Sequence, residues 1–176
     1  MRVKHIRSSL VPVASVLGLV LVACGGTSPS AGQGGAQVSI PPGGAQTIAV
    51  SLGETGPGQM YMNLNQPAVA AGPVTFVVTN EGDKEHEFIV LQTDTSAGDF
   101  PVMSQNEAMQ MEGGGMGHMH DFDEEAPGIV AVDEIEDLAA GATDRLEVNL
   151  KPGHYALVCN LRGHYTGGMW ADFQVT

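Results

Sequence analysis

Hydrophobic and polar residues alternate along several stretches of the chain with the period of two that half-buried β-strands show. In the clearest case, 144–150, Leu146, Val148 and Leu150 share one face, and charged or amide side chains share the other. Other runs rich in β-branched and aromatic residues, bounded by Gly, Pro, Asn or Asp, predict strands at 47–52, 59–64, 74–79, 86–91, 129–135, 155–158 and 168–175. About eight short strands without an amphipathic helix predict an all-β fold, a Greek-key β-sandwich.

Two stretches in the middle of the chain shape this prediction. The strand at 86–91 follows the one at 74–79 after a short turn, so we expect it to be a hairpin partner or a near neighbour of that strand. Residues 94–127 hold Gly, Met, His and acidic residues with no sustained period. A loop of this length inside a compact domain is often functional or disordered. We therefore expect one folded domain over 46–176 with an insertion at about 94–127.

The N-terminal region has the features of an export signal. Three basic residues precede the apolar run 10–22, which is shorter than the roughly 20 residues of a membrane span but typical of a signal peptide. The run ends in Leu-Val-Ala-Cys and resembles a bacterial lipoprotein signal, which implies removal of 1–23 and lipidation of Cys24. Residues 24–45 are rich in Gly and Ser and would form a flexible tether. We expect an extracytoplasmic protein, anchored by lipid to a bacterial membrane on the periplasmic side or at the cell surface.

The charge of the chain is strongly negative. Its 7 Lys and Arg residues face 20 Asp and Glu residues, for a net charge of −13. Loss of residues 1–23 would leave four of the seven basic residues and all 20 acidic ones, a net charge of −16. Nucleic acid is excluded as a natural partner, because it is bound through Lys and Arg at its phosphates. A redox protein with a cationic docking surface fits better, since long-range attraction speeds the encounter.

With Cys24 lipidated, Cys159 is the only thiol left. In an oxidising compartment such a residue is a buried inert thiol, half of an intermolecular disulfide or a metal ligand. The segment that begins at Cys159 also places an imidazole, His164, and a thioether, Met169, within 11 residues. Two His, one Cys and a weak axial Met are typical of copper electron-transfer sites. His86, at the start of a predicted strand, is the best candidate for the second imidazole.

The motif Cys159-x4-His164-x4-Met169, with an upstream Asn-x-Gly-x3-His motif that ends at His86, resembles the cupredoxins. The ligand-loop spacing is most similar to that of rusticyanin, sulfocyanin and auracyanin. This resemblance implies a β-sandwich with one mononuclear type 1 copper that carries single electrons. It also implies that His86 and His164 are equatorial nitrogen ligands, Cys159 the thiolate ligand and Met169 the axial ligand.

The sequence departs from the cupredoxin pattern at two positions. Many relatives have Pro before the Gly-His of the ligand loop, and Arg162 stands there instead. Because Pro stiffens the backbone, this change predicts a looser loop that is more exposed to water. Many relatives also follow the first His with an Asn that ties the two ligand-bearing strands together. Glu87 stands there instead and puts that tie in question.

The insertion contains a second concentration of possible copper ligands. Residues 103–120 hold five of the nine methionines and two histidines. Thioethers suit Cu(I) and imidazoles suit Cu(II), so additional copper could bind here. The alternative is a flexible lid whose methionines cover the copper edge or a partner surface. The densest set of candidate ligands is Met116, His118, Met119 and His120.

Three classes of function remain in view. The favoured one is an electron carrier with one type 1 copper, and the alternative is a copper-trafficking or copper-storage lipoprotein that uses the Met- and His-rich loop. An enzyme such as a copper oxidase or nitrite reductase needs a second, catalytic copper centre with several further histidines. Apart from the two ligand histidines, the mature chain has only His118, His120 and His154, which argues against an enzyme.

Overall fold

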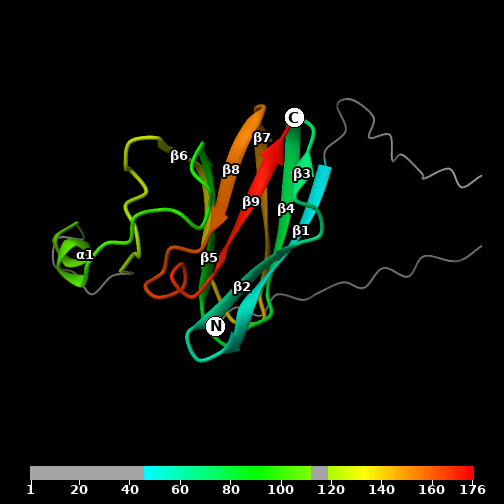
Figure 1. Ribbon diagram of the computed structural model, residues 1–176. Coiled ribbons are helices and arrows are strands. Elements are labelled where there is room, and N and C mark those ends of the chain that lie inside the picture. The colour runs from blue at the N-terminus through cyan, green and yellow to red at the C-terminus, as the bar shows by residue number, and fades with distance from the viewer. Residues whose placement is uncertain (1–45, 112–118) are drawn as a thin grey trace, which may run out of the picture. The chain divides into compact units, whose positions relative to one another are not determined.

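The computed structural model describes residues 46–111 and 119–176. The predicted signal peptide and tether, with Cys24, lie outside the described residues, as do Met116 and His118. Nine strands in the described part form two sheets that face each other (Figure 1). They are β1 (Gln46–Gly56), β2 (Gln59–Leu64), β3 (Ala68–Val69), β4 (Gly72–Asn80), β5 (His86–Thr93), β6 (Ile129–Leu138), β7 (Thr143–Leu150), β8 (Gly153–Val158) and β9 (Trp170–Val175).

The predicted β-sandwich is confirmed. One sheet has the strand order β2-β1-β4-β7 and the other β3-β9-β8-β5-β6. The pairs β1–β4 and β3–β9 are parallel and the other pairs antiparallel, so both sheets are mixed. Each of the eight predicted strands is present. The ninth, β3, has only two residues and therefore no sequence period that could reveal it.

Of the two arrangements expected for the strands at 74–79 and 86–91, the hairpin is wrong, and the two strands are near neighbours across the core instead. β4 lies between β1 and β7, whereas β5 lies between β8 and β6 in the opposite sheet. The turn between them therefore crosses from one sheet to the other. Asn80, which is fully buried, holds this crossing in place, because its amide Nδ2 donates hydrogen bonds to the carbonyl oxygens of Lys84 (2.7 Å) and Leu138 (2.9 Å).

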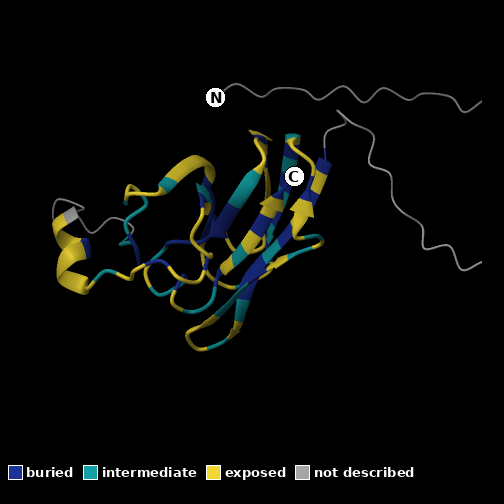
Figure 2. Ribbon diagram, turned by 45° about the horizontal axis from the view of Figure 1, so that its top comes forward, coloured by how far each residue is buried: buried dark blue, intermediate teal, exposed yellow. Residues whose placement is uncertain are grey.

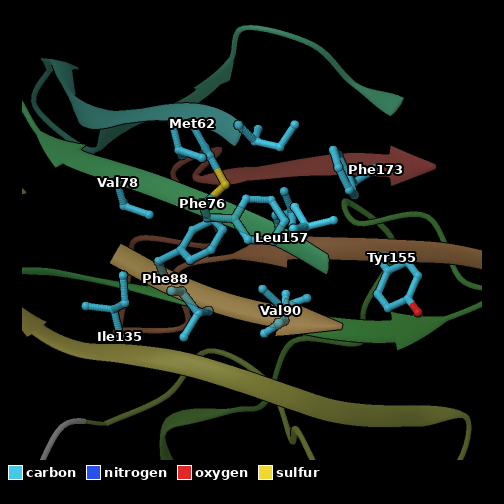
Figure 3. Close-up of a cluster of buried hydrophobic side chains, with 14 of the residues drawn as sticks. Met62, Phe76, Val78, Phe88, Val90, Ile135, Tyr155, Leu157 and Phe173 are labelled. Atoms are coloured by element: carbon cyan, nitrogen blue, oxygen red, sulfur yellow. The ribbon is translucent and has the colours of Figure 1, made fainter. Parts of the chain in front are cut away.

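The main core lies between the two sheets (Figure 3). Phe76 on β4 packs against Phe88 on β5 and Phe173 on β9, with ring centroids 5.2 Å and 5.5 Å apart. These contacts join the two sheets directly, and burial of such aromatic side chains supplies much of the stability of a small domain. Buried residues alternate with exposed or half-buried ones along β1, β4 and β7, as the sequence pattern predicts (Figure 2).

β5 and β8 are different, because they are buried on both faces. A second, smaller cluster covers their outer face with side chains from the insertion and the ligand loop. Phe100 and Phe122 of the insertion pack against each other and against Tyr165, with ring centroids 4.8–6.0 Å apart. The Tyr165 hydroxyl also accepts a hydrogen bond from the backbone N–H of Phe100 (2.9 Å). The described ends of the insertion are thus packed against the sandwich.

The insertion also contains a short helix, α1 (Gln105–Met111), which the sequence analysis did not predict. It lies to one side of the two sheets (Figure 1). Ser104 and Glu107 form a capping box, in which the Ser104 N–H donates to Glu107 Oε2 (2.8 Å) and the Glu107 N–H donates to Ser104 Oγ (3.4 Å). Among the described residues, no helix is long and apolar enough to cross a membrane.

Candidate metal centre

Two neighbouring strands deliver the first two candidate ligands. His86 is the first residue of β5, and Cys159 directly follows Val158, the last residue of β8. β5 and β8 pair antiparallel, with Ile89 opposite Val158, so the start of one lies beside the end of the other. Both His86 and Cys159 are fully buried. The sheet therefore holds an imidazole and a thiol side by side where these two interior strands end.

The third candidate, His164, comes from the loop between β8 and β9 and is less buried. Its Nδ1 atom lies 3.1 Å from His86 Nδ1 and 3.4 Å from Cys159 Sγ. The ligand atoms of the three residues all lie within 4.8 Å of one another. Two imidazole nitrogens that each bind one metal ion at about 2.0–2.1 Å lie about as far apart as the two Nδ1 atoms do here, at 3.1 Å. Spacing and ligand chemistry thus both fit a mononuclear metal ion.

The protonation states of these three side chains in the metal-free protein also suit metal binding. Burial, followed by the neighbouring His164, lowers the pKa of His86 to about 4. Burial also lowers the pKa of His164. Both imidazoles are therefore neutral at pH 7 and have lone pairs to donate. Burial raises the pKa of the Cys159 thiol to about 12, so the thiolate needs a compensating positive charge, which a bound metal ion supplies.

Two groups next to the ligands orient them. His86 Nε2 lies 3.3 Å from Glu54 Oε1, and Glu54 Oε2 accepts the backbone N–H of Asp83 (3.0 Å). A carboxylate on Nε2 favours the tautomer with its proton there and leaves Nδ1 free for metal. On the other side, the Glu87 N–H donates to Cys159 Sγ (3.4 Å). Such a hydrogen bond to the sulfur is one way in which a protein tunes the potential of a copper site.

Met169 is fully buried and belongs to the same core cluster as Cys159. Its N–H donates to the carbonyl oxygen of His164 (3.1 Å), and its carbonyl oxygen accepts the N–H of Cys159 (3.0 Å). The backbone of Met169 is thus hydrogen-bonded to the two residues that the sequence motif groups with it.

Glu87 still ties the two ligand-bearing strands together. Its Oε1 accepts the N–H of Asn160, the residue after Cys159, at 2.6 Å. A carboxylate oxygen of Glu87 therefore makes the link between the two strands that we expected an Asn at this position to make. Burial raises the pKa of Glu87 to about 7, against the opposing effects of the Asn160 hydrogen bond and of His120, and repulsion from Glu124 and Glu134 adds a smaller increase.

The expectation of a loose ligand loop is wrong, because the insertion holds the loop at several points. The Arg162 N–H donates to the carbonyl oxygen of Met119 (2.6 Å), a bond that Pro could not make. An isolated antiparallel bridge joins His120 to Leu161. With Arg in place of Pro, the loop loses the rigid proline ring but gains a backbone hydrogen bond to the insertion.

The sequence analysis missed the residue that contributes most to this arrangement. Asp121 is 1% exposed. Its carboxylate accepts the N–H of Gly163 and both the N–H and the hydroxyl of Thr166, all at 3.0 Å. Arg162 Nε lies 3.8 Å from the same carboxylate. In sequence Asp121 is one acid among four within 121–125, and no local pattern marks it as buried.

Of the four residues proposed for a second copper site, only Met119 and His120 fall within the described residues. The structure places the His120 side chain beside Glu87 and Glu124, with one ligand atom of each within 4.8 Å of the others. His154, the remaining described histidine, is near Thr93 O (2.8 Å) and Asp172 Oδ1 (2.9 Å) on the strand ends.

The solved structures that the chain matches include an auracyanin, an azurin and a rusticyanin. Reduced auracyanin from Roseiflexus castenholzii shares 17% identity at a TM-score of 0.48, over 76% of this chain and 99% of that chain. An azurin from Methylomonas sp. strain J shares 11% at 0.47, over 76% and 99%. Reduced rusticyanin shares 16% at 0.45, over 76% and 81%. No curated protein matches the chain.

The family comparison covers most of the sequence. The model of the sulfocyanin (SoxE) domain matches residues 40–176, a range that includes every described strand and all the candidate ligands of the metal centre. The cupredoxins, to which sulfocyanin belongs, hold one type 1 copper and transfer electrons to redox partners. The chain therefore belongs to the sulfocyanin family, as a cupredoxin that binds copper for electron transfer.

Proposed function

We propose that His86, Cys159, His164 and Met169 hold the type 1 copper, and that the protein carries single electrons at the outer face of a bacterial membrane. The observation that supports the ligand set is the convergence of His86 Nδ1, His164 Nδ1 and Cys159 Sγ on one small volume. When bound, the copper supplies a one-electron couple between Cu(II) and Cu(I). The role of Met169 as axial ligand rests on the sequence motif and on its burial beside Cys159.

The surrounding residues suit an electron carrier, which works best when its ligands keep one geometry in both oxidation states. His86 and Cys159 are fixed by paired strands, and Glu87 and Asn160 join those strands at the site. His164 lies in a loop that Asp121 anchors through Gly163 and Thr166. A preorganised site of this kind needs little rearrangement when its charge changes.

The alternative, copper trafficking or storage through the Met- and His-rich loop, remains a prediction. The described part of the insertion supports the electron carrier, because Met119 and His120 are joined through their backbones to the ligand loop. Titration of the reduced protein with Cu(I) against a competing chelator distinguishes the two functions. An electron carrier takes up one copper that exchanges slowly, whereas a storage protein takes up more than one.

The proposed location depends on Cys24 as the lipidated residue and on residues 24–45 as the tether. The apolar run 10–22 before a Cys and the Gly- and Ser-rich stretch after it support this proposal. The redox partner would then meet an acidic domain held close to the membrane, and a cationic docking surface on the partner would suit that charge.

The two cysteines allow one matched experiment. In the copper-loaded protein made in a bacterium, Cys159→Ser should abolish the intense visible absorption of thiolate-to-copper charge transfer and leave the lipid in place. Cys24→Ser should do the reverse, preventing lipidation with the colour intact. Wild-type protein that is colourless with Cu(II) would contradict the ligand set. A mature N-terminus other than a lipidated Cys24 in mass spectrometry would contradict the anchor.

A further inference from the structure

The strand pair that carries the copper ligands also presents side chains on its other face. Successive residues of a strand point to opposite sides. The inner-face residues Phe88 and Leu157 belong to the main core, whereas their neighbours Ile89 and Val158 belong to the outer cluster. By the same alternation, Glu87 follows the ligand His86, and Asn160 follows the ligand Cys159, on the outer face.

On that outer face three side chains with metal-binding atoms come together. Glu87 lies on β5, His120 in the segment bridged to Leu161, and Glu124 shortly after it in the insertion. One ligand atom from each lies within 4.8 Å of the other two. His120 and Glu124 lie 33 and 37 residues after Glu87 in the sequence. Only the folded chain brings the three side chains together.

Asn160 holds the two carboxylates of this cluster in position. Its N–H donates to Glu87 Oε1 (2.6 Å), and its Nδ2 donates to Glu124 Oε1 (2.7 Å). Asn160 is fully buried and Glu87 is 6% exposed. Carboxylates that bind metal ions are commonly oriented in this way, by a hydrogen bond to one oxygen. The arrangement therefore has the fixed supporting contacts of a built site.

The cluster is accessible and negatively charged. His120 and Glu124 line a cavity of about 340 Å³ with Met103, Phe122 and Asp123, which gives a hydrated ion a path to these two ligands. Glu134 on β6 is a further acidic neighbour of Glu124. A divalent cation would relieve the repulsion between these carboxylates.

We propose that Glu87, His120 and Glu124 form a second metal site, which binds a divalent first-row ion such as Zn²⁺ separately from the type 1 copper. One imidazole and two carboxylates, with coordination positions open to water, form a ligand set that zinc accepts. Ca²⁺ and Mg²⁺ prefer sites made of oxygen alone, and Cu(I) prefers thiolates and thioethers.

This second site is coupled to the copper because its residues are next to copper ligands in the chain. Glu87 directly follows His86, and Asn160 directly follows Cys159, so a cation on the outer face lies close to the copper ligands. Its positive charge disfavours Cu(II) more than Cu(I) and therefore raises the reduction potential. By linkage, the reduced protein binds Zn²⁺ more tightly than the oxidised protein does.

The experiment uses protein already loaded with one copper and freed of excess metal by a chelator. Zn²⁺ is added while bound zinc is measured by equilibrium dialysis, and the reduction potential is measured with and without zinc. The wild type should bind one zinc per chain without losing its visible colour, and its potential should rise. His120→Ala and Glu124→Gln should each weaken zinc binding by about tenfold or more and remove the rise in potential.

A control variant makes the result specific. Glu125→Gln removes the same charge as Glu124→Gln from a neighbouring residue of the cavity wall and should leave zinc binding unchanged. The proposal is overturned if the wild type binds no zinc beyond its copper, or if His120→Ala binds as tightly as the wild type. Because colour and zinc uptake are measured separately, loss of copper binding remains distinguishable from loss of the second site.

Discussion

Asp121 and Thr166 are joined by two hydrogen bonds, since Asp121 Oδ2 accepts both the backbone N–H and the hydroxyl of Thr166 at 3.0 Å. Asp121 belongs to the insertion, and Thr166 lies two residues after the proposed copper ligand His164. The carboxylate is buried, whereas Thr166 is exposed. The contact therefore fixes the exposed part of the ligand loop to a buried carboxylate.

Replacing Asp121 should loosen the copper site. Asp121→Ala leaves the amides of Gly163 and Thr166 without their acceptor, at a cost of about 1–3 kcal/mol in the free energy of unfolding. Copper should then be lost faster to a Cu(I) chelator. Asp99→Ala, which removes an exposed acid from the same insertion, is the control. Equal rates of copper loss in both variants would show that Asp121 does not hold the loop.

The carboxylate of Glu54 should set both the affinity and the potential of the copper site. Glu54→Gln removes a negative charge 3.3 Å from His86 Nε2, so Cu(I) becomes favoured and the reduction potential should rise. Copper affinity should fall by about 10–100-fold, the usual effect of losing such a partner. Glu81→Gln changes the same charge on a residue hydrogen-bonded to Tyr61 and should change the potential less. A potential equal to that of the wild type in Glu54→Gln would contradict this role.

The axial position can be tested by a change of ligand chemistry. Met169→Gln replaces a soft thioether with a harder amide oxygen, which favours Cu(II), so the potential should fall while copper remains bound. Met60→Gln is a suitable control, because Met60 packs against Gly167 of the same loop without belonging to the proposed ligand set. If Met169→Gln keeps the wild-type potential, Met169 is a core residue and not a ligand.

Glu87 should make the stability of the metal-free protein depend on pH. Its pKa is raised to about 7, mainly by burial, so the folded state binds a proton that the unfolded state releases at lower pH. The stabilisation is complete below the unfolded pKa, near 4.5, and is lost as the pH rises through about 7.

Glu87→Gln keeps an oxygen acceptor for the Asn160 N–H and cannot ionise, so it should lose less stability than the wild type between pH 5 and pH 8. Urea unfolding of both proteins in the presence of a metal chelator measures the difference. The two histidines of the copper site act in the opposite direction and in both proteins alike, because their lowered pKa values cost stability as the pH falls below about 6.5. Parallel pH curves for the two proteins would contradict the prediction.

The strands could be predicted from sequence because their signals are local. The alternation of Leu146, Val148 and Leu150 fixes the buried face of β7, and turn residues mark the ends of β4. Whether β4 and β5 form a hairpin or only lie near each other could not be decided from sequence, because a short connection is compatible with either a hairpin or a crossing between sheets. The contacts that decide it, from Asn80 to Leu138, are 58 residues apart.

The same distinction applies to the site. The spacing of Cys159, His164 and Met169 is a local motif, and so the sequence indicates it. The roles of Asp121 and Asn160 depend on contacts across about 40 residues, which no local period reveals. The run at β5 does carry an overlooked signal: its five residues after His86 include four consecutive apolar ones, which is typical of a strand buried on both faces. That signal points to a covering segment such as the insertion.

The bridge between His120 and Leu161 has a consequence for how the protein reaches its native state. The ligand loop is short in sequence, but the partners that order it lie about 40 residues earlier, beyond three intervening strands. Closing so long a stretch of chain has an entropic cost that only the docked insertion offsets. We therefore expect the loop to be among the last parts to become ordered, and the sulfocyanin-family copper site to take its final form only when β6, β7 and β8 are already in their sheets.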